Sequence, residues 1–289
     1  LFSKALKPLP CWTSFPHPMY PTLNGLVGRL NHLGHDYVDI KAADISIGLK
    51  VYIDRYGTYK DHTITKINPD GTYNITEKNN VPLAKLKQKV THILPLLLFI
   101  TKGVHDEGGN IVTINIPISI IGESRDGCIV IGGLWMRGKK EDDVNVSNLT
   151  LRDAKGDGVC GWHGPSIHLD NVSVENSEDE GVEVRGTKRN SMKNCNVSHS
   201  TSSGLVVHGG GLMTIDGSGT TIHHNCTDGE DSDCYGLHTS SSSASIYLAS
   251  YLTIEMISKN NEGGENYGGQ GTIKTNRSKE QITSCVDEQ

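Results

Sequence analysis

The amino-acid sequence predicts an all-β solenoid, in which short strands stack in repeated turns along the second half of the chain. Residue patterns recur there every 23 residues, and a fixed period of this length is typical of repeat architectures. Apolar residues alternate within each repeated strand, which buries one face and leaves the other in water. The composition agrees, because 33 glycines and only 6% aromatic residues favour short strands joined by many turns.

Residues 1–45 are predicted to form a proline-rich arm. Proline fixes one backbone dihedral angle and lacks an N–H group, so a high density of proline disfavours a regular helix or a central strand. The stretch 24–33 has too brief a periodicity to decide between a helix and a loop. The prolines that define this arm are Pro8, Pro10, Pro16, Pro18 and Pro21.

Residues 46–90 are predicted to form a small β-barrel. Short alternating runs at 48–53, 62–67 and 71–75 indicate strands, and Asn68-Pro69-Asp70-Gly71 between the last two has the composition of a hairpin turn. The stretch from Ser46 to Lys87 resembles the SH3-like barrels of the Tudor and agenet type. Where that family has an acidic Asp-Asp-Gly hairpin, this chain has Glu77-Lys78-Asn79-Asn80.

The Tudor-like resemblance implies a peptide reader, in which aromatic side chains form a cage around a methylated cation. The alternative is that the same aromatic side chains pack a small hydrophobic core. The candidates for the cage are Tyr52, Tyr56, Tyr59 and Tyr73.

Residues 91–289 are predicted to form a parallel β-helix of about six to seven turns with a C-terminal cap. Asparagines recur at Asn148, Asn171 and Asn194, and glycines recur at Gly158, Gly181 and Gly204. Because equivalent residues of stacked turns lie above one another, the asparagines are expected to form a ladder at a corner. The glycines are expected at corners that need unusual dihedral angles.

The repeats from Val104 to Thr275 resemble the pectin-lyase-like superfamily of right-handed parallel β-helices. Residues 103–124, with Gly103-Val104-His105-Asp106-Glu107 and Ile116-Pro117-Ile118-Ser119-Ile120, are similar to the opening turn of pectin methylesterases and of NosD-type carbohydrate-binding repeats. The resemblance implies a right-handed fold and a connection with polysaccharides. It leaves the activity open, since one fold hosts many functions.

The strand that follows each recurring glycine carries the candidate site. Stacking predicts an outward column of Trp162, Arg185, His208 and Ser240, and an aromatic ring beside cationic groups can bind a sugar chain. We expect a non-catalytic carbohydrate-binding or surface-interaction protein whose ligand contacts Trp162, Arg185, His208 and His238. An inert surface is the alternative for the same column.

A second possibility is a polysaccharide lyase or epimerase acting on uronate-rich glycans. Such an enzyme needs a cation that neutralises the carboxylate of the sugar and a base that removes the neighbouring proton. Glu183, Arg185 and His208 are the candidates if they converge. Calcium is expected only in this case, and otherwise no cofactor or metal is predicted.

Charge and cysteine content limit the remaining possibilities. A net charge of −6 with mixed signs argues against a nucleic-acid partner, and no apolar run approaches the roughly 20 residues that a membrane span needs. Seven cysteines are an odd number, and only Cys226 and Cys234 are predicted to pair. His223-His224 is interpreted as an exposed polar corner.

Seven Asn-x-Ser/Thr sequons favour a secreted or cell-surface protein. The alternative is that several of these asparagines begin strands of the repeat. The sequence leaves the identity of the glycan and the oligomeric state open.

Overall fold

The structure is a computed structural model that describes residues 12–33, 37–39, 42–55, 58–89, 96–162, 164–187, 189–228, 233–263 and 265–275. Two compact units divide the chain: one comprises the described parts of Leu1–Gly28 and Leu94–Gln289, and the other those of Arg29–Ile93. Neither helix in the described residues has the length and hydropathy that a membrane crossing requires.

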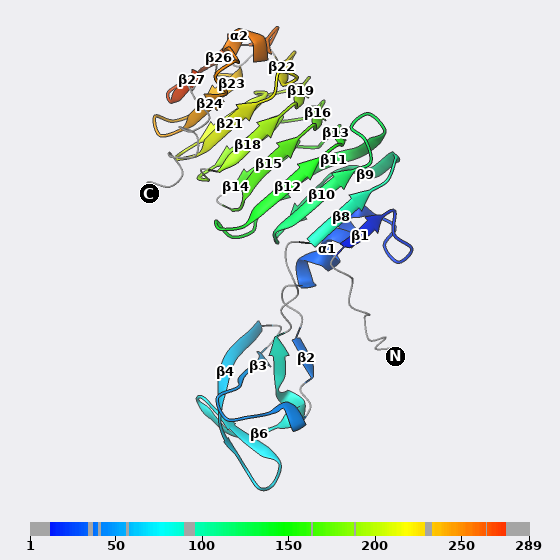
Figure 1. Ribbon diagram of the computed structural model, residues 1–289, viewed down its shortest axis with the longest axis vertical. Helices are drawn as coiled ribbons and strands as arrows, with labels where there is room; N and C mark the ends of the chain where they lie inside the picture. The colour runs from blue at the N-terminus through cyan, green and yellow to red at the C-terminus, as the bar shows by residue number, and fades with distance from the viewer. Residues whose placement is uncertain are drawn as a thin grey trace. The chain divides into compact units, whose positions relative to one another are not determined.

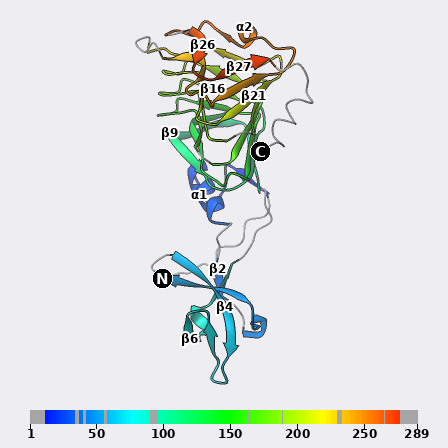
Figure 2. The same cartoon turned by 90° about the vertical axis from the view of Figure 1, so that its left-hand side faces the viewer.

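The larger unit is a parallel β-helix of about eight turns, which Figure 1 shows as a stack of parallel strands and Figure 2 shows from the side. Its first sheet contains, in spatial order, β1 (Trp12–Phe15), β8 (Leu96–Ile100), β10 (Ile118–Gly122), β12 (Asp143–Ser147), β15 (Ser166–Asp170), β18 (Asn190–Lys193), β21 (Leu212–Asp216), β24 (Ser245–Leu248) and β27 (Thr272–Thr275). The expectation of six to seven turns was too low, because the stack begins before the recognisable repeat, with β1 and β8.

The second sheet has two arms that meet at the long strand β11 (Cys128–Met136). Arm one contains β13 (Thr150–Arg152), β16 (Ser173–Glu175), β19 (Asn196–Ser198), β22 (Thr221–His223) and β25 (Ser258–Lys259). Arm two contains β14 (Val159–Trp162), β17 (Val182–Arg185), β20 (Leu205–His208), β23 (Tyr235–Thr239) and β26 (Glu265–Gly269). The strand β9 (Gly103–Ile114) pairs with both halves of β11, and the short helix α2 (Ile254–Ile257) precedes β25.

The predicted asparagine ladder is present at the corner between the first sheet and arm one. Asn148, Asn171 and Asn194 all have left-handed backbone conformations, with φ of 56°, 55° and 51°. The side-chain amide of Asn171 donates to Oδ1 of Asn148 at 2.9 Å. Asparagine tolerates this conformation better than most residues, so the sequence repeat follows directly from the corner geometry.

The recurring glycines have a different cause from the one expected. Gly158, Gly181 and Gly204 do not have positive φ. A Cβ at Gly158 would lie 2.2 Å from Cγ1 of Val174, and one at Gly181 would lie 2.3 Å from Cγ1 of Val197. These positions therefore require glycine because arm one packs directly against the start of arm two, leaving no room for a side chain.

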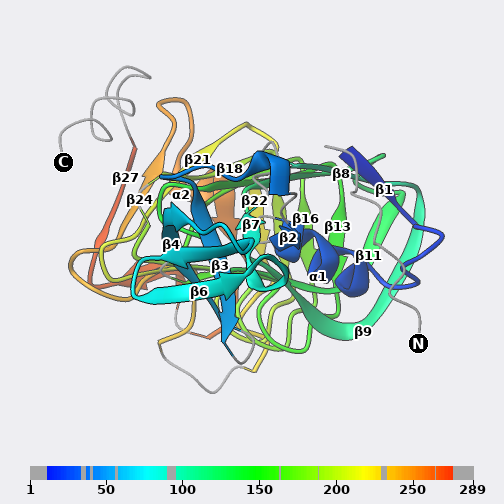
Figure 3. The same ribbon diagram turned by 90° about the horizontal axis from the view of Figure 1, so that it is seen from below.

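The N-terminal segment covers the first turn of the β-helix. Residues Trp12–Phe15 form β1, the outermost strand of the first sheet, beside β8. The described part of the predicted proline-rich arm therefore contains a regular strand and a helix. The helix α1 (Leu23–Leu33) follows, and Glu107 accepts hydrogen bonds from the backbone N–H groups of Leu23 and, at 3.1 Å, Asn24. A carboxylate at a helix N-terminus stabilises the exposed N–H groups there. Figures 1 and 3 show α1 near β1 at the N-terminal end of the β-helix.

The smaller unit has six strands in the order β2 (Tyr37–Asp39), β7 (Lys87–Lys89), β3 (Lys50–Arg55), β4 (Thr58–Ile67), β5 (Thr72–Ile75) and β6 (Lys78–Pro82), all antiparallel. Two short 3₁₀ turns, η1 (Ala42–Asp44) and η2 (Leu83–Lys85), join them. The predicted turn lies between β4 and β5, and Gly71 there has φ of 78°. The core of this unit consists of Val51, Ile53, Ile64, Tyr73, Ile75, Val81 and Leu86.

Candidate functional site

The predicted column on arm two is in register. Trp162 is the strand partner of Arg185, and Arg185 is the strand partner of His208. The guanidinium carbon of Arg185 lies 3.9 Å from the centre of the Trp162 ring, which is a cation–π contact. Ser240, directly after β23, completes this Trp162 column, with its Oγ 2.6 Å from Nδ1 of His208. Trp162 is 46% exposed.

Cys160 and Glu183 belong to a second column on the same face of arm two, beside the Trp162 column. Glu183 contacts residues of both columns. Its carboxylate contacts three side chains: Nε2 of His208 at 3.0 Å, Nη2 of Arg185 at 3.2 Å and Sγ of Cys160 at 3.1 Å. Burial raises the pKa of Glu183, but hydrogen bonds from His208, Cys160 and Arg185 outweigh it and bring the pKa down to about 2. Glu183 is therefore ionised at neutral pH although only 7% of its surface is exposed.

The ionised carboxylate fixes the direction of the hydrogen bonds through His208. A carboxylate only accepts, so Nε2 of His208 carries a proton and donates to Glu183. In the neutral ring, Nδ1 then accepts from the hydroxyl of Ser240. This chain of contacts leaves His208 able to accept a proton at Nδ1, the requirement for a general base.

An acidic cluster lies beside Glu183, at the turns that lead into arm two. Burial raises the pKa of Asp157 to about 6, and burial together with the neighbouring Asp179 raises the pKa of Glu180 to about 9. Two sets of side chains converge closely enough to hold a metal ion, namely Asp157 with Cys160 and Glu183, and Asp157 with Asp179 and Glu180. Burial and the neighbouring Glu183 raise the pKa of Cys160, which keeps it a thiol.

The sequence contained a signal for this acidic cluster that the prediction missed. Asp157 and Glu180 each stand directly before a recurring glycine, Gly158 and Gly181, and are 23 positions apart. The backbone N–H of Glu180 donates to Oδ1 of Asp157 at 3.3 Å across this step. The same spacing separates Cys160 from Glu183, which are strand partners.

Other predicted site residues lie elsewhere. His238 is the strand partner of Val206 and so belongs to the column of Cys160 and Glu183, where its ring lies 5.1 Å from that of Tyr235. Cys226 and Cys234 form a disulfide. The cysteines Cys128, Cys160 and Cys195 are buried and free.

The aromatic residues suggested for a cage in the smaller unit differ in their surroundings. Tyr73 is only 5% exposed and belongs to the hydrophobic core, while Tyr52 is half-buried. Tyr56 and the side chain of Tyr59 lie outside the described residues. The burial of Tyr73 fits the alternative in which these rings pack a core.

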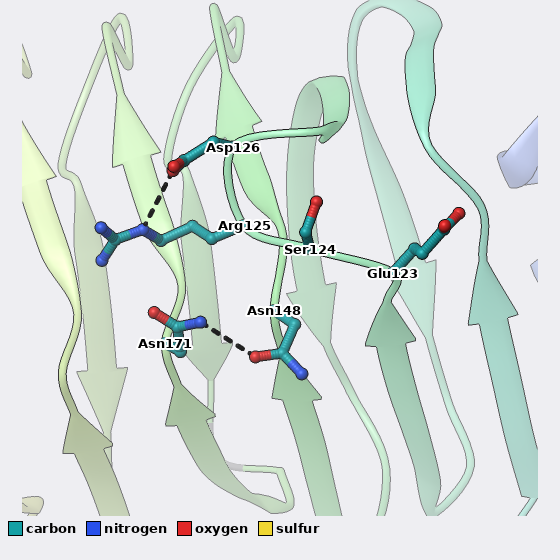
Figure 4. A pocket seen from close by; sticks show the side chains of 6 residues that line it. All are labelled: Glu123, Ser124, Arg125, Asp126, Asn148 and Asn171. Atoms are coloured by element: carbon teal, nitrogen blue, oxygen red, sulfur yellow. Dashed lines mark hydrogen bonds and ion pairs between the residues drawn. The ribbon is translucent and has the colours of Figure 1, made fainter.

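A hollow at another corner of the β-helix is shown in Figure 4. The loop after β10 lies over the asparagine ladder there, and Arg125 Nε contacts Asp126 at 3.4 Å. Arg125 also donates to the backbone oxygen of Asn194 at 3.4 Å. The lining residues are Glu123, Ser124, Arg125, Asp126, Asn148 and Asn171. Because the ladder amides and Arg125 are engaged in holding the corner, this hollow is part of the scaffold.

The stacked in-register strands, the corner ladder and the 23-residue turn define a right-handed parallel β-helix protein. The family model for the right-handed β-helix region matches residues 126–281. This match covers more than half of the chain, and the protein belongs to that family. Neither the comparison with curated proteins nor the comparison with solved structures gives a match.

Proposed function

We propose that the protein binds a glycan chain along the Trp162 column of arm two. The observation that carries the proposal is the alignment of an exposed tryptophan, a guanidinium, an imidazole and a hydroxyl on successive turns. Adjacent strands are about 4.8 Å apart, so the four positions extend over about 14 Å. An aromatic ring can stack on the apolar face of a sugar, while the polar groups bind its hydroxyls.

The local charge argues that stacking and hydrogen bonding, more than charge attraction, would select the glycan. The positive charge of Arg185 is balanced by Glu183 at 3.2 Å, and Asp157 and Asp179 add negative charge nearby. An anionic sugar would meet this negative charge. We therefore expect neutral glycans to bind at least as well as uronate-rich or sulfated ones.

The test compares retention of the protein on immobilised neutral, uronate-rich and sulfated glycans. Trp162→Ala should weaken retention at least tenfold. Trp12→Ala, which removes a tryptophan that is 61% exposed on β1, is the matched control and should leave retention unchanged. Equal retention of both variants and the wild type would contradict the proposal.

A second candidate function, a lyase or epimerase on uronate-rich glycans, is favoured by the convergence of Arg185 and His208 on Glu183. In that reaction Arg185 would neutralise the sugar carboxylate and His208 would remove the proton on the neighbouring carbon. In a lyase the electron pair left behind would form a C=C bond while the glycosidic C–O bond at the next carbon breaks, and the released sugar oxygen would take up a proton. The oxygen ligands of Asp157, Asp179 and Glu180 suit calcium. Ultraviolet absorbance from unsaturated products, abolished by His208→Ala, would establish a lyase. Retention without product would leave the binding function alone.

A further inference from the structure

Three histidines meet on arm one, at the corner that follows β19 and β22. The rings of His199 and His224 are stacked, with centroids 5.4 Å apart and planes 7° apart. The ring of His223 lies 5.0 Å from that of His224 and 6.2 Å from that of His199. We call this group the histidine corner. The sequence indicated His223 and His224, but His199 joins them only through the stacking of turns.

The nearest ring nitrogens of this corner are spaced like two ligands of one ion. Nδ1 of His223 and Nδ1 of His224 are 2.7 Å apart. Bonds of 2.0–2.1 Å from a tetrahedral zinc ion to imidazole nitrogens would place two ligand atoms about 3.3 Å apart, so the two nitrogens would have to separate slightly. A small rotation of two side chains is therefore enough to admit an ion between them.

A second contact fixes which nitrogen of His223 carries its proton. Nε2 of His223 lies 2.9 Å from Oδ1 of Asn196. This oxygen also accepts from the hydroxyl of Thr221, while the amide nitrogen of Asn196 donates to Ser173. An amide oxygen only accepts, so Nε2 of His223 is protonated and its Nδ1 is the acceptor of the 2.7 Å contact with His224. Nδ1 of His224 therefore carries the donated proton, and a bound ion would take the place of that proton between the two nitrogens. Metal-binding histidines have this arrangement, with an outer acceptor that orients the ring.

The surroundings of His223 lower its pKa. Partial burial lowers the pKa of His223, and His224, His199 and Lys259 lower it further. Along the same strand position, Arg152 and Glu175 neutralise each other at 2.7 Å, and Ser198 is uncharged.

We propose that His223 and His224, with the ring of His199 stacked on that of His224, form a binding site for a late first-row divalent cation such as Zn²⁺, Ni²⁺ or Cu²⁺. Imidazole ligands suit these metals and not Mg²⁺ or Ca²⁺. The site lies on arm one and shares no residue with the Trp162 column, so it does not depend on the proposed glycan binding.

Equivalent positions on neighbouring turns of the β-helix show which residues can replace each histidine. His199 and His224 have φ of 59° and 53°, and the equivalent corner positions Asn176 and Asn260 have φ of 56° and 55°. His199→Asn and His224→Asn therefore place at each corner a residue that the fold already uses there. Ser198 is the strand partner of His223, so His223→Ser is the corresponding change in the strand.

The experiment titrates the whole 289-residue chain, without a histidine tag, with Ni²⁺ and with Zn²⁺ in a calorimeter at pH 7.5. We expect one bound ion per chain, a loss of affinity of at least tenfold in His223→Ser and in His224→Asn, and a smaller loss in His199→Asn. His62→Gln, which removes a histidine of the smaller unit, should bind as the wild type does.

Two further measurements distinguish the loss of a ligand from the loss of the fold. Circular dichroism and thermal unfolding establish that each variant is folded, and the Cu²⁺ electron paramagnetic resonance spectrum should show coupling to nitrogen that is lost in His223→Ser. Binding that is equally strong in the folded triple variant, or no binding by the wild type, would overturn the proposal.

Discussion

At the scale of single residues, the environment of arm two gives neighbouring carboxyl groups opposite properties. Glu183 accepts three hydrogen bonds and its pKa falls to about 2, while Glu180, three positions earlier, has a pKa of about 9. Both groups are partly or fully buried. The difference arises from their partners, because Glu183 faces an imidazole and a guanidinium and Glu180 faces Asp157 and Asp179.

Glu180→Gln should make the stability of the protein less sensitive to alkaline pH. A raised pKa means that the unfolded state loses its proton at a lower pH than the folded state does, so stability is full below about pH 4.5 and is lost as the pH rises to about 9. Thermal unfolding between pH 7 and 9 should therefore show a smaller decrease for Glu180→Gln than for the wild type. This window lies above the pKa of Asp157.

The control for this prediction is Glu178→Gln, because Glu178 is exposed in the same turn. That variant should follow the wild type at every pH. If Glu180→Gln also follows the wild type, then Glu180 is already ionised in the folded protein and the acidic cluster has a different charge from the one described.

At the scale of structural elements, the corners determine how one strand leads to the next. Asn171→Ala should lower the free energy of unfolding by about 2–3 kcal/mol. Alanine in a left-handed conformation costs about 1–2 kcal/mol, and the side-chain hydrogen bond to Asn148 is lost. Asn171→Gly also loses this hydrogen bond, but glycine adopts the left-handed conformation without steric cost. It should therefore cost only about 1 kcal/mol. Urea unfolding should rank asparagine above glycine and glycine above alanine; the reverse order for the last two would refute the backbone argument.

The disulfide between Cys226 and Cys234 closes a loop between β22 and β23, with eight positions separating the two cysteines. A loop of this size restricts the unfolded chain by about 2–3 kcal/mol. Replacing both cysteines with serine should reduce the free energy of unfolding by about that amount, measured by urea titration without reductant. Reduction of the wild type should give the same loss. The serine variant should not respond to reductant.

The elements also show how far sequence reasoning reaches. The 23-residue period predicted the stacking, the asparagine ladder and the alignment of Trp162, Arg185 and His208, since each depends only on equal spacing in register. Glu107 and the start of α1 are more than 80 residues apart in the sequence, and no local sequence pattern predicts their contact. The burial of Glu183 was also missed, because it depends on the turns that precede β14 and β17.

At the scale of the whole molecule, the β-helix is a one-dimensional stack in which each turn contacts mainly its neighbours. Deleting residues 171–193 removes one complete period and joins Asp170 to Asn194, whose backbone conformation matches that of Asn171. We expect a folded protein with a single unfolding transition, somewhat less stable than the wild type, and with weaker glycan retention because the Trp162 column is shorter by one turn. Circular dichroism and thermal unfolding measure the first two properties.

Deletion of residues 171–181 alone is the informative control. About half a turn is then missing, so the strands that follow would present the wrong residues to the interior. This shorter deletion should prevent folding of the β-helix. If it is tolerated as well as the complete deletion, register does not hold the stack together.

The segment that covers the first turn has a consequence for how the molecule behaves in a crowded solution. A stack of parallel strands has, at each end, a row of backbone groups ready to pair with another chain. At the N-terminal end, β1 is the outermost strand and α1 follows it, held by Glu107. If the contact between Glu107 and α1 were lost and β1 detached, β8 would become the outermost strand and could pair with a neighbouring molecule. We therefore expect that loss of the Glu107 contact would favour end-to-end association of the molecules.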